Sequence, residues 1–186
     1  MEMETESDLI NKIYVQLTVD TDRLVDACIN GKIHISKDAD TPSVIDRFYV
    51  LAIASNGALI KDKTHKVISL RANVGNYIQF HGVSEYNNMD NPILIYAVDK
   101  YSGNDVLDDF VSRKLILPAL EPGKDVLPPI FADMDFWYLG AIAVHKGTGI
   151  FNIKFALYQR DRKQEDPILY GFFCWQLKIV VRGIVK

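Results

Sequence analysis

Hydrophobic and polar residues alternate along much of this chain with a period of two, the pattern of β-strands that bury one face. The clearest example is residues 147–181, where two alternating runs flank a charged connector, residues 160–167. One face of the second run is nearly all apolar and includes Phe173 and Trp175. We predict a long hairpin here. Because a lone hairpin is marginal in water, other strands must cover its apolar face.

Shorter stretches with strand-like patterns precede this hairpin. We expect strands at 12–19, 47–54, 67–72, 77–82, 93–98 and 136–145. The 47–54 stretch is apolar on both faces, which favours a central place in a sheet. Residues 73–76 read as a tight turn, so we expect the strand at 77–82 to return beside the strand at 67–72. Asn56-Gly57 has the composition of a turn with positive φ.

Two further segments interrupt the strands. Residues 21–29 are expected to form a short helix, because Asp20 or Thr21 can cap its start and Gly31 can end it. From residue 99 to residue 135 the alternation disappears, and four prolines punctuate the sequence. We expect a long loop there, with a helical turn at 104–113. A loop of this length is either functional or a packed excursion.

Together these elements predict an all-β protein with one or two short helices. Strands do not alternate with helices, so an antiparallel β-sandwich of two sheets fits best, with a jelly-roll or small barrel as the alternative. The length of 186 residues suits one domain. We expect a disordered tail at 1–9 and a single domain at 10–186.

Charge and cysteine content narrow the classes of function. The net charge of −3 argues against a nucleic-acid partner, which would require a basic face. The start of the chain resembles no signal peptide, and no apolar run could span a bilayer, so we expect a cytoplasmic protein without a membrane partner. Cys28 and Cys174 read as small buried hydrophobic residues with reduced thiols.

Motifs for catalysis and metal binding are missing from the sequence. It contains no nucleophile elbow, phosphate-binding loop or dinucleotide fingerprint. The four histidines are not spaced as metal ligands, although His81 and His145 end separate expected strands and could meet in space. We therefore predict no enzymatic activity, no catalytic residues, no metal and no cofactor.

One pattern is typical of a carbohydrate site. Residues 85–91 and 133–140 combine aromatic side chains with Asn and Asp, which can stack on sugar rings and bond their hydroxyls. The candidate ligand-binding residues are Trp137, Asn87, Asn88 and Asp135. The alternative interpretation, which we favour, is a strand start with core aromatics beside a solvated turn.

Several short segments, taken in order, resemble one family, the PixA/AidA-type inclusion-body proteins of bacteria. The matching segments are residues 19–21, 70–80, 93–96, 136–137, 147–148, 155–157 and 171–175. Gly75-Asn76 and Trp175-Gln176-Leu177 stand where the family usually has Gly-Asp and Trp-Asp-Pro, which indicates a divergent member. The resemblance implies a compact β-sandwich without known enzymatic activity, sometimes deposited as inclusions and sometimes under quorum control. The chain's four methionines are few for a storage role.

The first functional hypothesis is a non-enzymatic, self-associating protein of the inclusion-body type, whose partner is a further copy of itself. Low net charge and exposed strand edges would permit such packing. The alternative is a lectin-like carbohydrate-binding module, whose partner would be a glycan. An enzyme with an unrecognised site is the third hypothesis.

Overall fold

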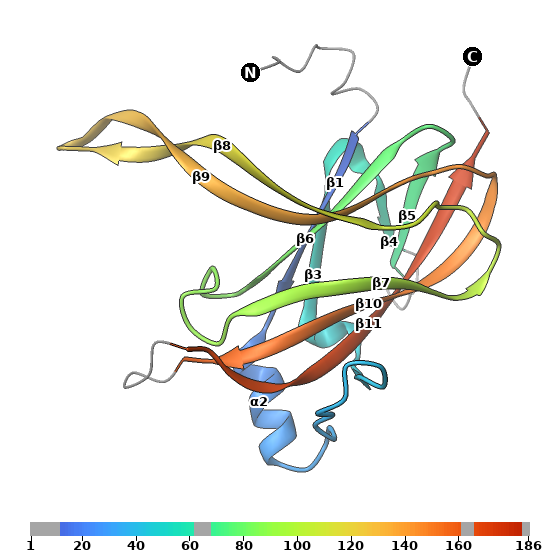
Figure 1. Cartoon of the computed structure of the whole chain (residues 1–186), viewed down its shortest axis with the longest axis horizontal. Coiled ribbons are helices and arrows are strands. Elements are labelled where there is room, and N and C mark those ends of the chain that lie inside the picture. Colours follow the sequence, from blue (N-terminus) through green and yellow to red (C-terminus); the bar gives the residue numbers. More distant parts are fainter. Residues whose placement is uncertain (1–11, 62–67, 161–165, 184–186) are drawn as a thin grey trace.

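The computed structural model describes residues 12–61, 68–160 and 166–183 as two β-sheets packed face to face (Figure 1). The first sheet has the strand order β3 (Val50–Ala54), β1 (Lys12–Val19), β6 (Tyr77–Ser84), β9 (Val126–Ile142) and β8 (Val111–Gly123). The second has the order β4 (Leu59–Lys61), β5 (Ile68–Asn73), β11 (Ile168–Arg182), β10 (Gly147–Gln159) and β7 (Ile93–Gly103), and β2 (Ser43–Val44) also pairs with β11. We call these sheet 1 and sheet 2.

The hairpin at the end of the chain forms the centre of sheet 2, as the sequence predicts. β10 and β11 pair antiparallel, with Phe155 opposite Phe173 and Ile153 opposite Trp175. The rings of Phe155 and Phe173 stack with centroids 5.8 Å apart. Both phenylalanines and Trp175 are at most 3% exposed. The apolar face of this hairpin therefore forms one side of the core, and sheet 1 packs against it.

The helix is also confirmed. α2 spans Thr21–Ile29, and the Asp20 side chain accepts a hydrogen bond from the backbone N–H of Arg23 at 3.0 Å. Its buried face includes Leu24 and Cys28, which join the core. Both central residues of the Asn56-Gly57 turn have positive φ, as expected.

The all-β sandwich is confirmed, but its sheets are mixed rather than purely antiparallel. β1 pairs parallel with β6, and β11 pairs parallel with β5. The tight turn at 73–76 does not return the chain beside the preceding strand. Instead it carries the chain from β5 in sheet 2 to β6 in sheet 1. A short turn of this kind suits a hairpin or a corner between sheets equally well, and only non-local pairing decides between them.

Two expectations for individual segments are wrong. The stretch 47–54 is not a central strand: Arg47–Tyr49 form a 3₁₀ turn, and β3 is an edge strand with Leu51 and Ile53 each 57% exposed. Apolar side chains on both faces indicated double burial, but the outer face of sheet 1 is uncovered here.

The expected loop at 99–135 is wrong as well. It contains the end of β7, a short connection at 104–110, the whole of β8 and the first part of β9, and no helix forms at 104–113. β8 and β9 pair antiparallel over their length and leave the body as a twisted ribbon (Figure 1). Both faces of the outer ribbon meet water, so its sequence shows no alternation between apolar and polar positions.

The expected tail at 1–9 lies outside the described residues, as does most of the connector at 160–167. Within the described residues, no helix is long and apolar enough to span a membrane.

Candidate functional site

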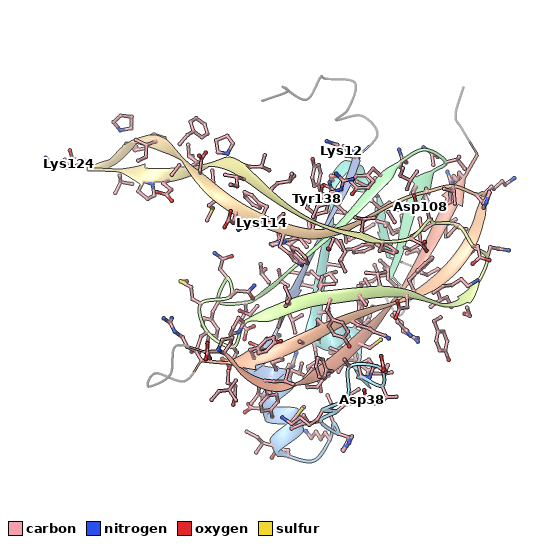
Figure 2. The ribbon with its side chains drawn as sticks, viewed as in Figure 1. Lys12, Asp38, Asp108, Lys114, Lys124 and Tyr138 are labelled. Carbon is pink, nitrogen blue, oxygen red and sulfur yellow. The ribbon has the colours of Figure 1, made fainter. Side chains whose placement is uncertain are left out.

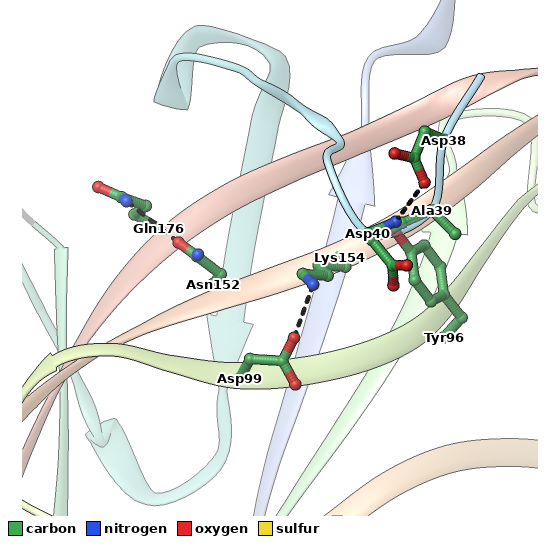
Figure 3. Close-up of polar contacts among 8 residues, drawn as sticks. All are labelled: Asp38, Ala39, Asp40, Tyr96, Asp99, Asn152, Lys154 and Gln176. Atoms are coloured by element: carbon green, nitrogen blue, oxygen red, sulfur yellow. Dashed lines mark hydrogen bonds and ion pairs between the residues drawn. The ribbon is translucent and has the colours of Figure 1, made fainter. Parts of the chain in front are cut away.

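Polar contacts on the outer face of sheet 2 hold segments of the fold together (Figure 3). The Lys154 ammonium lies 2.8 Å from the Asp99 carboxylate, and the Tyr96 hydroxyl donates to the backbone oxygen of Ala39 at 2.7 Å. Burial raises the pKa of Tyr96 to about 12. No group of three or more His, Cys, Asp or Glu side chains able to hold a metal occurs among the described residues. The Tyr96 hydrogen bond fastens the loop at 38–40 to sheet 2, and the Lys154–Asp99 ion pair joins β10 to β7 within that sheet.

The four residues of the expected carbohydrate site lie on two elements. Asn87 and Asn88 are in the turn between β6 and β7, both with positive φ. The Asn88 side chain is used within this turn: its Oδ1 accepts from the backbone N–H groups of Ser84 and Ile93, and its Nδ2 donates to the Ile93 oxygen. Its role in this geometry is to hold the turn.

The other two residues are on β9. The indole Nε1 of Trp137 lies 3.5 Å from the backbone oxygen of Ile95, and Asp135 pairs with Lys114 at 2.7 Å. Among the described residues, no hydrogen bond or ion pair joins the side chains of the turn to those of β9. A sugar site at these four residues stays a prediction.

The most prominent surface feature is the ribbon of β8 and β9 beyond the body, residues 114–134, which we call the arm. Figure 2 shows Lys124 at its end, Lys114 nearer the body and Tyr138 where the ribbon joins the body. Of the 22 large hydrophobic side chains exposed among the described residues, ten lie between residues 111 and 137. Those on the arm are Ile116, Leu117, Leu120, Val126, Leu127, Ile130, Phe131 and Met134, which are 44–74% exposed.

Strand register divides the arm into two faces. Residues directly opposite in an antiparallel pair share a face, and successive residues alternate between faces. Leu117 opposite Met134 and Ala119 opposite Ala132 lie on one face. Leu120 opposite Phe131 lies on the other, together with Ile116 opposite Asp135. Both faces are thus apolar, which is unusual for a two-stranded ribbon in water.

A groove of about 260 Å³ lies where the arm joins the body. Alternate residues of β1, such as Ile13 and Val15, belong to the core, so Tyr14 between them belongs to the outer face of sheet 1. The lining comes from four neighbouring strands and includes Tyr14, Gln79, Leu115, Leu117, Phe136 and Tyr138. The side chains are mostly apolar or aromatic, and Tyr14 is 46% exposed.

The groove and one face of the arm are continuous. Leu115 is paired with Phe136, and Leu117 is paired with Met134, so all four lie on the same side of the ribbon. We call this side of the arm the groove face and the opposite side, with Leu120 and Phe131, the far face. The outer surface of sheet 1 therefore presents one mostly apolar strip from Tyr14 to the outer arm, which also includes Gln79 in the groove and Glu121 opposite Ile130.

Comparison with known families identifies the chain. The model of the PixA inclusion body protein family matches residues 11–181. This chain belongs to the PixA family. The match includes the arm, the groove and the terminal hairpin, so these elements all fall within the family's domain.

Solved structures support the fold of this PixA-family chain. The crystal structure of an inclusion body protein from Burkholderia cenocepacia J2315 is similar with a TM-score of 0.76 and 21% identity, covering 92% of this chain and 96% of the other. The solution structure of amebosin matches with a TM-score of only 0.24 and 12% identity, over 61% of this chain and 88% of the other, and carries no argument. Comparison with curated proteins gives no match.

The arm and groove were missed from the sequence, although one signal was present. Residues 111–137 contain many large apolar residues without periodicity. In a segment that is not buried, such a composition indicates a surface made for contact. The candidate functional site of this PixA-family protein is this apolar strip.

Proposed function

We propose that this PixA-family protein is a non-enzymatic, self-associating protein of the inclusion-body type in the cytoplasm, whose copies pack through the arm. The observation that carries the proposal is the exposure of eight large hydrophobic side chains on a ribbon that projects from the body. Monomeric proteins rarely keep contiguous apolar patches of this kind in water, and such patches mark interaction sites. Family membership is consistent with dense packing of copies.

The energetics of the arm are of the right size for association. Fully burying a large apolar side chain stabilises by about 1.5–3 kcal/mol, so burying half of each gives roughly 1 kcal/mol per residue. The eight residues then contribute about 8 kcal/mol per arm. The eight residues lie on both faces of the arm, so a contact through one face of each of two arms contributes about 8 kcal/mol, which falls within the estimates, about 4–15 kcal/mol, of the cost of association.

The two apolar faces also suit growth beyond a pair. A ribbon that is apolar on one side can bury that side against one neighbour. A ribbon that is apolar on both sides has a second face that can bury itself only in another contact. Contacts that do not close on themselves propagate into filaments or lattices. The low net charge of −3 opposes such packing only weakly.

Sedimentation of the purified protein over a wide range of concentrations tests the proposal. The expected result is a rise in mean mass with concentration. A double variant, Ile130→Glu with Phe131→Glu, introduces one carboxylate on each face of the arm and should stay monomeric. Because both side chains are more than half exposed, the body should keep its circular dichroism spectrum.

The matched control is Ile29→Glu, at the end of α2, because Ile29 is 74% exposed, as is Phe131. This variant should associate as the wild type does. A wild-type protein that remains monomeric at every concentration would refute self-association. Equal weakening by Ile29→Glu and by the double variant would show that the arm is not the contact.

A further inference from the structure

The strand edge of the arm limits the ways in which a partner can contact it. β8 ends the strand order of sheet 1, so within the part of the chain that the structure describes one of its edges has no partner strand. It carries Pro118 and Pro122, which lack the N–H that a neighbouring strand would need. Pro118 lies within the regular ladder opposite Asp133, and Pro122 lies at the irregularity between Glu121 and Gly123. Prolines on an edge strand oppose edge-to-edge pairing, so contact through the faces of the arm is favoured.

The groove face has the shape for close sheet-on-sheet contact. Between Leu117 and Ile130 it carries Ala119 directly opposite Ala132. Two small side chains leave a shallow depression between larger ones, into which bulky side chains of a facing sheet can interdigitate. The far face has no such depression at this level, because Leu120 lies opposite Phe131 there.

The groove cannot be filled by the arm of the same molecule. β8 and β9 themselves supply Leu115, Leu117, Phe136 and Tyr138 to its wall, and the ribbon then runs away from the body (Figure 1). Its occupant must therefore come from elsewhere. A second copy presents an apolar ribbon, and residues 111–135 carry three cations and four carboxylates, so no strong field of one sign opposes the contact.

We propose that the groove face of each arm packs across the groove of a second copy, so that two copies exchange arms about a two-fold axis. This inference rests on the proposed function and specifies its first contact. The groove and the groove face are one continuous strip, and a two-fold axis brings such a strip onto its own copy, which is the geometry of a closed dimer. The far faces then remain outside and available for further packing.

Single substitutions on neighbouring residues test which face is used. Ile130→Glu alters the groove face, and Phe131→Glu is its matched control on the far face. We expect Ile130→Glu to weaken the dimer about tenfold or more, as for a central apolar contact. Phe131→Glu should leave the dimer intact and reduce only larger assemblies. Equal weakening by both variants, or stronger weakening by Phe131→Glu, would overturn the inference.

A mixing experiment tests exchange between arm and groove. Tyr14→Lys alters the groove on β1, and Tyr101→Lys is its control on β7 of sheet 2. Ile130→Glu and Tyr14→Lys should each dimerise poorly alone. Mixed in equal amounts they should form a heterodimer, because one arm and one groove remain intact and the new carboxylate and ammonium fall in the same contact. Native mass spectrometry distinguishes the heterodimer by mass.

Two failures are distinguishable. In the first, the wild type associates and the double arm variant does not, but Tyr14→Lys dimerises normally and the mixture forms no additional heterodimer. The groove is then not the receiving surface, and the proposed self-association stands. If the wild type is monomeric at every concentration, self-association fails, and the arm exchange fails with it.

Discussion

Glu85 offers the sharpest test of how the two sheets are tied to the helix. Its carboxylate accepts hydrogen bonds from the backbone N–H groups of Thr21 at 2.7 Å and Asp22 at 2.9 Å, and from the Thr21 hydroxyl at 3.0 Å. Thr21 is fully buried. Glu85, which directly follows β6, therefore caps the first two N–H groups of α2, while Asp20 accepts from the third, that of Arg23.

The pKa of Glu85 reflects these contacts. Burial alone would raise it, but the hydrogen bonds from the backbone N–H groups of Thr21 and Asp22 outweigh burial, and the pKa is lowered. A carboxyl whose pKa is lowered on folding stabilises the protein above its unfolded pKa of about 4.3. This stabilisation is lost as the pH falls through the lowered pKa of the folded state.

The variant Glu85→Gln keeps the shape and removes the charge. One carboxylate oxygen becomes an NH₂ group that cannot accept, so at least one hydrogen bond is lost and those that remain are neutral. Charge-assisted bonds exceed neutral ones by about 1 kcal/mol each, and helix caps contribute about 0.5–2 kcal/mol. Because the side chain is partly in water, we expect a loss of about 1.5 kcal/mol, or roughly 3–6 °C in Tm.

Urea unfolding at one fixed protein concentration measures this loss, because self-association would otherwise shift the apparent stability. The difference between wild type and Glu85→Gln should be present at pH 7 and smaller at pH 3, because the stabilisation is progressively lost as the pH falls below the unfolded pKa towards the lowered pKa of the folded state. Asp109→Asn, an exposed carboxyl outside the arm and the groove, is the control and should change stability by less than about 0.5 kcal/mol. An equal loss at both pH values, or no loss at pH 7, would refute the reasoning.

Other predictions concern the core and one glycine. Trp175→Ala should lower the free energy of unfolding by about 3–5 kcal/mol, clearly more than Trp137→Ala, since the indoles are 3% and 38% exposed; urea titration would show the opposite order if the core were misplaced. Burial raises the pKa of Cys174 to about 11 and also raises that of Cys28, so iodoacetamide should label neither before unfolding; rapid labelling of the native protein would contradict this. Gly103→Ala should lower the free energy of unfolding by about 1–3 kcal/mol, because φ is +90° and a Cβ would lie 2.5 Å from a backbone oxygen of β10. Thermal unfolding measures this loss, and an unchanged Tm would refute the prediction.

The alternation of apolar and polar residues was sufficient to locate most strands. It located the terminal hairpin and the burial of Phe173 and Trp175, because one face of each strand is continuously buried. Capping chemistry located α2 to the residue, since Asp20 and Gly31 act on their own neighbours in the chain. These features depend on interactions within a short stretch of sequence.

Tertiary structure decided which strands pair and which surfaces stay in water. Nothing local distinguishes a turn within a sheet from one that carries the chain between sheets, so β5 and β6 could not be separated from the sequence. Alternation of apolar and polar residues arises where one face of a strand is buried. It therefore cannot indicate the strands of the arm, whose two faces are both exposed in a single copy. It also misplaced β3, because apolar residues such as Leu51 and Ile53 look the same whether the surface above them is core or water. Local sequence thus locates strands that bury one face, whereas pairing between distant segments creates the apolar strip on which association is proposed to depend.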